Sequence, residues 1–380
     1  MPGLYLHIPF CQQKCLYCDF VSYPGQQARL EAYIEALLME AERFVKERDW
    51  GLFETVFLGG GTPSLLSGAQ LTYLLDGIRQ RFKLSPEAEI SMECNPGTLD
   101  LEKLLAYRAA GVNRLSIGVQ SLENHLLKSI GRIHNAAQAE QALALAQQAG
   151  FKNINVDVMH GLPGQQQEEY IHTLNRIIDF SPTHISAYCL IVEQGTPLSA
   201  QIEAGIVKLP EEDNTYLMQD LGMLLLEERG YKRYEISNFA RPGYTCAHNI
   251  NYWNNGAYLG LGAGAHSAWN LPGLGWSRWE NTFDIEEYIA GSASGRVINE
   301  PQRIPKKEEQ FETIMLGLRQ ICGVKLDAFF KRFGVSVFDA YPKATQKLMD
   351  IGWLEATQGY IRLTTKGLDM QNTALQYFLE

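Results

Sequence analysis

The sequence predicts an α/β fold: a partial six-unit β/α barrel (TIM-like) followed by a smaller, mainly helical domain. Short apolar runs recur through the first half of the chain, helix-period segments separate them, and polar residues stand where the runs end. A strand followed by a helix, repeated six times, is typical of parallel strands joined by helical crossovers. Because strand order is invisible in a sequence, an open doubly wound sheet is the competing prediction.

The order of the predicted elements places unusual residues at the ends of successive strands. The expected strands are Leu4–Ile8, Thr55–Leu58, Glu89–Glu93, Arg114–Val119, Ile154–Met159 and His184–Ile191, and the expected helices are Ala28–Arg48, Gly68–Phe82, Leu101–Ala110, Ala136–Ala149 and Gln166–Phe180. The strands end at or near a cysteine loop, Gly59–Gly61, Glu93, Gln120, Asp157 and Glu193. A β/α barrel builds its active site at these carboxyl ends, so we expect one site there.

The segment from about Pro305 differs in character. It predicts helices over Lys306–Gln320, Leu326–Phe333 and Val337–Met349, a hairpin over Trp353–Leu363 and a final helix, a winged-helix-like pattern. Basic and acidic residues nearly balance there, so it lacks a basic face for phosphates and is expected to be a packing module or lid. The predicted division is 1–235 for the barrel, 236–304 for a connecting segment packed on it, and 305–380 for the C-terminal domain.

Composition excludes several classes of protein. A formal net charge of −10 over 380 residues argues against nucleic acid as a partner. Seven cysteines without a secretory signal indicate a reducing, cytoplasmic location. No run approaches the ~20 apolar residues of a transmembrane segment, while peripheral membrane contact stays open.

Cys11, Cys15 and Cys18 have C-x3-C-x2-C spacing and no fourth cysteine beside them. Three thiolates on a 4Fe–4S cluster would leave one iron open to a small molecule. Structural zinc is the alternative, and it would need a fourth ligand such as His7. Tyr17 and Phe20 interleave the motif and would shield a cluster from water. The thiols of Cys94, Cys189 and Cys322 lie in apolar runs and are expected to be inert.

Two further motifs carry candidate binding groups. Gly59-Gly60-Gly61-Thr62-Pro63 follows a strand, where glycines let the backbone approach a ligand and its amides donate; a tight turn is the alternative. The segment Tyr244–Trp253 concentrates aromatic rings with the soft ligands Cys246 and His248. Imidazole and thiolate both bind haem iron, so His248 is the preferred haem-binding candidate and Cys246 the second. A hydrogen-bonded structural histidine is the alternative.

Together these motifs resemble the radical S-adenosylmethionine (SAM) superfamily. Five phrases are similar to the oxygen-independent coproporphyrinogen III oxidase family: Tyr5–Cys11, Gly59–Ser64, Gly118–Ser121, Asp157–Gly164 and Tyr234–Ala240. The resemblance extends from Tyr5 into the C-terminal domain, which is of the HemN type. It implies a 4Fe–4S cluster on the three cysteines and SAM on the open iron, where an electron frees a 5′-deoxyadenosyl radical. The zinc alternative is correspondingly disfavoured.

The resemblance also assigns a set of SAM-binding residues by position: Tyr5, Tyr17, Gly60, Gly61, Thr62, Glu93, Gln120, Arg132 and Asp157. It implies that glycine amides receive the amino acid portion of SAM and that Arg132 pairs with a carboxylate. Glu93 and Asp157 would accept from an ammonium group or ribose hydroxyls. An ordinary hydrogen bond at the barrel rim is the alternative for each.

Two departures separate the chain from the oxidase. The oxidase motif continues to a fourth cysteine where this chain has Phe20, and the oxidase carries an N-terminal extension where only four residues precede Tyr5 here. Both features, with H-N-x-x-Y-W at 248–253, resemble the haem chaperone (HemW) branch of the family. The resemblance therefore implies binding of haem and its transfer to haem-accepting proteins, with respiratory enzymes as candidates.

The predicted function is a cytoplasmic haem chaperone that carries a 4Fe–4S cluster and SAM, with no catalytic residue assigned. The alternative is a radical SAM coproporphyrinogen III dehydrogenase, which decarboxylates propionates oxidatively. A radical SAM enzyme acting on tRNA is a third hypothesis, and the acidic charge balance disfavours it. A homodimer linked through the cluster is compatible with either of the first two.

Overall fold

The first half of the chain forms six parallel strands that lie side by side in sequence order. The computed structural model describes residues 2–295 and 297–379. The strands are β1 (Gly3–Ile8), β4 (Leu52–Gly60), β5 (Lys83–Cys94), β6 (Arg114–Gln120), β7 (Asn153–His160) and β8 (His184–Cys189). Each pairs in parallel with the next. This order is that of a β/α barrel and excludes the doubly wound alternative, whose strand order reverses within the sheet.

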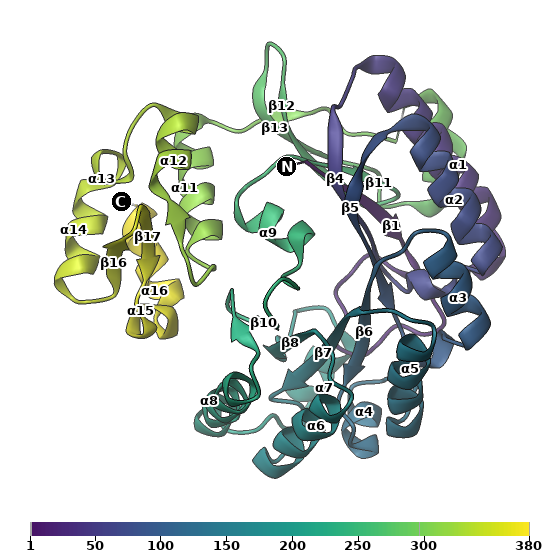
Figure 1. Cartoon of the computed structure of the whole chain (residues 1–380), viewed down its shortest axis with the longest axis horizontal. Coiled ribbons are helices and arrows are strands. Elements are labelled where there is room, and N and C mark those ends of the chain that lie inside the picture. Colours follow the sequence, from purple (N-terminus) through teal and green to yellow (C-terminus); the bar gives the residue numbers. More distant parts are fainter. Residues whose placement is uncertain (1, 296, 380) are drawn as a thin grey trace.

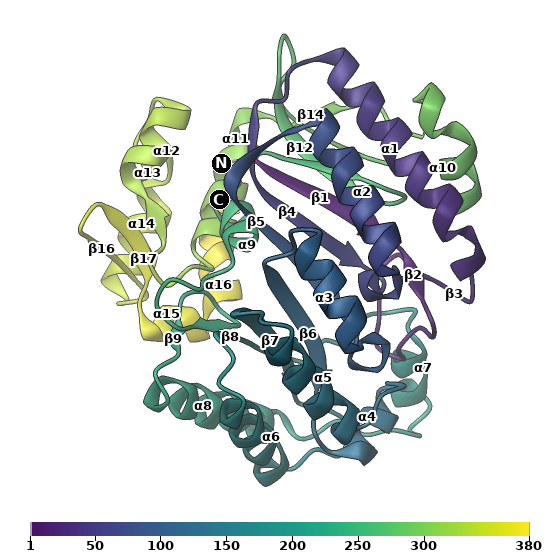
Figure 2. The same cartoon turned by 45° about the vertical axis from the view of Figure 1, so that its right-hand side comes forward.

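Helices connect these strands and cover the outer face of the sheet (Figure 2). They are α1 (Leu30–Glu47), α2 (Gly68–Arg81), α3 (Leu101–Ala109), α4 (Asn124–Ser129), α5 (Ala136–Gln148) and α6 (Gln167–Asp179). The side chains of Ser67 and Asn135 accept hydrogen bonds from the N3 backbone N–H of α2 and α5. The N3 side chains, Gln70 and Gln138, accept in turn from the backbone N–H of these capping residues. These capping boxes explain why both helices begin where the sequence predicts.

Strands from the second half extend the sheet at both edges, an extension absent from the sequence prediction. β11 (Tyr258–Leu261) pairs in parallel with β1, and β12 (His266–Leu271), β13 (Gly275–Glu280) and β14 (Gln302–Arg303) follow it antiparallel. β10 (Asn238–Ala240) and β9 (Lys232–Arg233) follow β8 at the other edge. The result is one open 12-stranded sheet curved into a partial barrel (Figure 1). A small parallel pair, β2 (Phe10–Cys11) and β3 (Tyr23–Pro24), lies beside it.

The remaining helices of this part are α7 (Pro197–Glu203), α8 (Glu212–Glu228), α9 (Ala247–Trp253) and α10 (Ile285–Gly291). α9 lies on the concave side of the sheet, where it contacts β4, and it separates the barrel from the C-terminal part (Figure 1). Within the described residues, no helix combines the length and apolar character that crossing a bilayer requires.

The C-terminal part encloses a hydrophobic core of its own, with buried members from Ile314 to Phe378. Its elements are α11 (Lys306–Gly317), β15 (Val324–Lys325), α12 (Leu326–Phe333), α13 (Val337–Ala340), α14 (Pro342–Asp350), β16 (Leu354–Thr357), β17 (Tyr360–Leu363), α15 (Thr365–Asp369) and α16 (Gln371–Gln376). The predicted hairpin is confirmed as β16 and β17. The predicted continuous helix over Val337–Met349 is wrong, because Tyr341 leaves helical geometry before Pro342 and splits it in two.

A buried carboxylate ties α1 to the strands added at the β1 edge. Glu40 accepts hydrogen bonds from the backbone N–H of Gly262 at 3.0 Å and from Asn281 Nδ2 at 2.7 Å, and the Tyr288 hydroxyl donates to it as well. Burial raises the pKa of Glu40 to about 7 despite these three donors. An unfolded glutamate has a pKa of about 4.3, so between these values the folded protein holds a proton that the unfolded chain has released.

We expect Glu40 to make the protein less stable as the pH rises from about 5 to 7, by on the order of 1–3 kcal/mol. Glu40→Gln stays neutral at every pH. The unfolding free energy of the wild type, relative to that of the variant, should therefore decline as the pH rises through this window. Denaturant unfolding at several pH values measures it. Glu47→Gln, at the exposed end of the same helix, is the matched control. Parallel pH profiles for wild type and Glu40→Gln would contradict the expectation.

Candidate functional site

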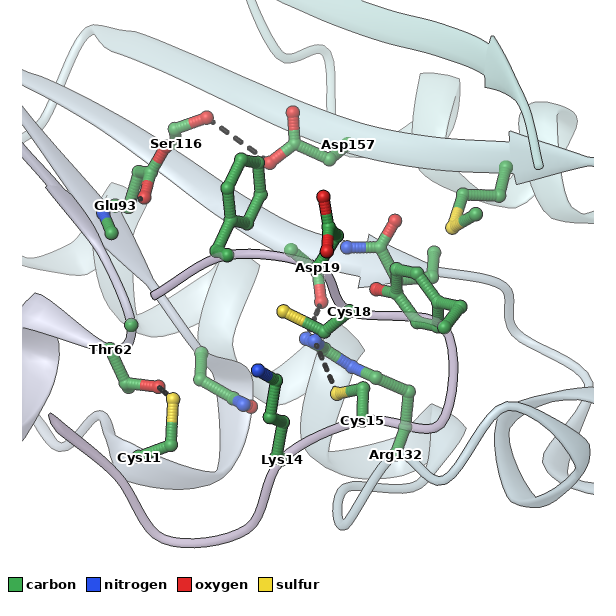
Figure 3. Close-up of a pocket in the computed structure, with 18 of the residues that line it drawn as sticks. Cys11, Lys14, Cys15, Cys18, Asp19, Thr62, Glu93, Ser116, Arg132 and Asp157 are labelled. Atoms are coloured by element: carbon green, nitrogen blue, oxygen red, sulfur yellow. Dashed lines mark hydrogen bonds between the residues drawn. The ribbon is translucent and has the colours of Figure 1, made fainter. Parts of the chain in front are cut away.

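The cysteine loop leaves the end of β2 and is held by backbone hydrogen bonds in its middle and at its exit. Leu16 donates its N–H to the carbonyl of Ile130 at 3.0 Å and accepts from the N–H of Leu198 at 2.9 Å. Tyr23 donates to the carbonyl of Pro9 where the loop ends. These anchors hold Cys11, Cys15 and Cys18 on the lining of one cavity (Figure 3).

The cavity, of about 420 Å³, lies at the carboxyl ends of the barrel strands, as the sequence predicts. Eight of the predicted SAM-binding residues line it together with the three cysteines: Tyr17, Gly60, Gly61, Thr62, Glu93, Gln120, Arg132 and Asp157. Tyr5 does not line it. The Tyr5 hydroxyl bonds His7 Nδ1 at 3.0 Å, and its side chain lines a neighbouring cavity instead.

The glycine run packs directly on the start of the cysteine loop. A Cβ on Gly61 would lie 2.7 Å from the carbonyl oxygen of Phe10, and one on Gly60, whose φ is +111°, 2.4 Å from the His7 ring. The amides are engaged within the protein: Gly60 N–H donates to Glu93, Gly61 N–H to Ile8 and Thr62 N–H to Phe10. The expectation of free donor amides is therefore wrong.

Two carboxyl groups form the inner wall of the cavity. Glu93 Oε2 accepts the Gly60 N–H at 3.1 Å, and Asp157 accepts from Ser116 Oγ at 3.1 Å and from Asn155 Nδ2 at 2.8 Å. Burial, followed by repulsion from Asp157, raises the pKa of Glu93 to about 7. Burial also raises the pKa of Asp157. A cationic ammonium group or hydroxyl donors would stabilise both carboxylates.

Arg132 brings a positive charge to the thiols. Its Nη1 lies 3.5 Å from Cys15 Sγ, and its Nη2 donates to the carbonyl of Gly118 at 2.5 Å (Figure 3). Nearby, Gln120 has a φ of +66° at a register shift in β6, and its Oε1 accepts from the Tyr188 hydroxyl at 2.9 Å. Left-handed backbone in a residue other than glycine is strained, and such strain concentrates at functional sites.

The sequence prediction missed six polar residues on this lining: Gln13, Lys14, Asp19, Asn95, Ser116 and Tyr188. Ser116 precedes Gly118 and Gln120 at alternate positions of one strand, so period-two alternation could have revealed it. Lys14 and Asp19 lie in the cysteine loop, where no periodic signal exists. Tyr188 could be placed only once the partners of β8 were known.

The predicted haem candidates do not reach a described cavity. The His248 side chain is fully buried, its Nδ1 lies 2.7 Å from Thr55 Oγ1, and its Nε2 lies 2.9 Å from the Tyr252 hydroxyl. The Cys246 side chain is also buried and contacts Glu89. Burial lowers the pKa of His248 to about 3. In this conformation both residues hold α9 against the barrel, and haem ligation would require breaking these contacts.

Comparison with known proteins places this geometry in a family. The chain matches the radical SAM superfamily over residues 5–177 and the HemN C-terminal domain over residues 304–370. It is 37% identical over 378 residues to the heme chaperone HemW of Escherichia coli (strain K12), covering 99% of this chain and 98% of that protein. The chain belongs to the HemW family. It is also 35% identical over 381 residues to the heme chaperone HemW of Bacillus subtilis (strain 168), covering 100% and 99%.

A solved structure shares the fold of this HemW-family protein. Coproporphyrinogen III oxidase (HemN) of Escherichia coli, a radical SAM enzyme, aligns with a TM-score of 0.84 at 24% identity, covering 99% of this chain and 90% of that one. The predicted α/β class and the predicted superfamily are thus confirmed. Radical SAM membership implies a 4Fe–4S cluster and SAM.

The described residues fit a cluster better than a single zinc ion. Only one group of three described metal-binding side chains brings its donor atoms within 4.8 Å of one another, and it is Glu123, His125 and Glu169. The three cysteine sulfurs are therefore spread more widely than one tetrahedral ion requires. His7 is also occupied, because its Nδ1 contacts Tyr5 and its Nε2 donates to the carbonyl of Val21 at 2.9 Å.

The same cavity also fits a small polar ligand such as SAM. Its volume falls in the range of ligand pockets. Two polar atoms of its lining residues, Arg132 Nε and Asn95 Oδ1, are buried without a hydrogen-bond partner in the described part of the chain. Buried polar atoms are normally satisfied, so these two favour a bound polar molecule.

Gly60→Ala should loosen the cysteine loop. The added methyl group would push the His7 ring, which holds the loop exit at Val21, and the positive φ adds strain. We expect a loss of about 2–4 kcal/mol in unfolding free energy and a lower iron content after anaerobic reconstitution. Gly97→Ala, after the neighbouring β5, is the control, because its Cβ would meet only an ordinary contact at 3.7 Å. Equal iron in both variants would refute this role for Gly60.

Proposed function

We propose that this protein is a haem chaperone that carries a 4Fe–4S cluster, binds SAM, and passes haem to acceptor proteins. The observation that carries the proposal is identity of 35–37% over essentially the whole chain to relatives named heme chaperone HemW. Phe20 supports it, since the related oxidase motif has a cysteine at that position. Haem-accepting proteins as partners, a cytoplasmic location and a homodimer remain predictions.

We infer that Cys11, Cys15 and Cys18 hold the cluster. Burial raises the pKa of Cys11 and of Cys18, so metal binding must displace their protons. The Thr62 hydroxyl, 3.5 Å from Cys11 Sγ, and Arg132, 3.5 Å from Cys15 Sγ, would stabilise the resulting thiolates. A cluster held by three thiolates would leave one iron open to SAM and would supply one-electron chemistry there.

The remaining wall of the cavity would hold SAM. Carbonyl oxygens of Gly60 and Gly61 and the Glu93 carboxylate would accept from its ammonium group, and Arg132 Nε would donate to its carboxylate. Asp157 and Gln120 would receive the ribose hydroxyls, while Tyr17 and Thr62 line the rest of the cavity. Tyr5 would act from the adjoining cavity through its contact with His7.

Replacing any of Cys11, Cys15 or Cys18 with alanine should abolish the iron–sulfur absorbance, because two thiolates hold a cubane poorly. Iron should fall from about four atoms per chain to background after reconstitution. Two other thiols are the controls: Cys94→Ala, a buried thiol on the same cavity lining, and Cys322→Ala, an exposed thiol of the C-terminal part; both variants should retain the wild-type spectrum. Full iron occupancy in a variant of the cysteine loop would remove that residue from the cluster.

Haem added to the purified protein with an intact cluster should give a shifted Soret band that saturates at a fixed stoichiometry. The measurement is an anaerobic titration followed by absorbance, with haem in the same buffer without protein as the blank. A second step mixes the loaded protein with a haem-free acceptor and follows transfer. A Soret band identical to that of free haem would sink the proposal.

The alternative function is a coproporphyrinogen III dehydrogenase, favoured by the structural similarity to HemN. The same preparation, given SAM, coproporphyrinogen III and dithionite without oxygen, distinguishes the two. A chaperone should leave the propionates intact. Formation of a vinyl product would establish the alternative.

A further inference from the structure

A second cavity, of about 570 Å³, adjoins the cysteine cavity across the segment Asp19–Phe20, which lines both. It lies between the β1 edge of the barrel and α11 of the C-terminal part. Flat and apolar side chains dominate its walls, among them Tyr5, Phe20, Tyr252, Tyr258, Phe283 and Met315. Aromatic rings of this kind suit the face of a large planar ligand.

We propose that this second cavity is the haem site and that His266 on β12 is a ligand of the haem iron. The inference rests on the proposed function and adds a location and a ligand to it. His266 lines the cavity, and its side chain is 49% exposed, so an iron atom can reach it without any rearrangement of the core.

The other histidine on this lining is not available. Both ring nitrogens of His7 are engaged, with Tyr5 and Val21. The ring of His266 has a single polar contact among the described residues, from Nε2 to Glu280 Oε2 at 3.5 Å. A carboxylate behind a histidine is the usual companion of a metal ligand, since it orients the ring and raises its basicity.

Charge indicates how haem would be oriented. Arg278 is the one lysine or arginine on the described lining, and Glu312 binds it through both carboxylate oxygens, at 3.0 and 2.9 Å. Among the described residues that line the cavity, no lysine or arginine is therefore free to pair with the two propionates. They should project toward solvent past Phe20 and Phe283, which are 69% and 46% exposed. A porphyrin held by its apolar edge with its charged groups outside suits a protein that hands haem on.

The test is haem titration of wild type, His266→Ala and His266→Tyr, each with its cluster intact. We expect His266→Ala to weaken binding at least about tenfold and to lose the wild-type Soret position. His266→Tyr should give a different spectrum, because a phenolate replaces the imidazole on iron. His125→Ala is the matched control: this histidine is 62% exposed and also contacts a glutamate, Glu169, at 3.2 Å. It should behave as wild type.

Met315→Trp tests the cavity independently of the ligand. The larger ring would fill the space beside α11, so haem binding should fall while the cluster absorbance and the unfolding temperature stay unchanged. Wild-type haem binding with unaltered affinity and spectrum in His266→Ala, or unaltered binding in Met315→Trp, would overturn the inference and leave the proposed function standing. Absence of haem binding by the wild type would overturn both.

Discussion

The close approach of the Gly60–Gly61 backbone to the segment Ile8–Phe10 is the constraint on which the site depends. Two backbone hydrogen bonds, from Gly61 to Ile8 and from Thr62 to Phe10, join the end of β4 to the start of the cysteine loop. No Cβ fits between them. The position of Cys11 is therefore set by backbone contacts, which hold it without the entropy cost of ordering long side chains. Glu93 and His7 then pack against the same glycines.

A series of hydrogen bonds explains why Cys246 and His248, at the start of α9, do not reach the cysteine cavity or the second cavity. Cys246 N–H donates to the Tyr234 hydroxyl, Tyr234 donates to His184 Nε2, and His184 Nδ1 donates to Asn155. Asn155 in turn donates to Asp157 at the cysteine cavity. In this series one ring nitrogen of His184 accepts a hydrogen bond and the other donates one, which requires a neutral imidazole. Burial lowers the pKa of His184 and so favours this neutral form. The start of α9 is thus connected through hydrogen bonds to Asp157 on the inner wall of the cysteine cavity, and its own side chains do not face a ligand site.

The parts of the fold that repeat or alternate could be predicted from the sequence. The six strands, their helices and the carboxyl-end site all follow from period and spacing, as do helix starts with capping residues such as Ser67. The strands beyond β1 and β8 could not, because they are short and pair with partners distant in sequence. His248 shows the same limit of sequence-based prediction for the functional site. Its chemistry suggests a ligand, and only the packing around it reveals that Thr55 and Tyr252 occupy both nitrogens.

Phe20 has a role that depends on the two cavities together. Phe20 follows Cys18 by two residues, with Asp19 between Cys18 and Phe20, and it lines both the cysteine cavity and the second cavity. A cysteine there would offer a fourth thiol to the cysteine cavity, whereas a phenyl ring offers an apolar wall to the second one. The chain is held on either side of this short, exposed segment, at Leu16 before it and at Val21 and Tyr23 after it. The residue that stands in place of the fourth cysteine therefore belongs to the walls of both the cysteine cavity and the second cavity.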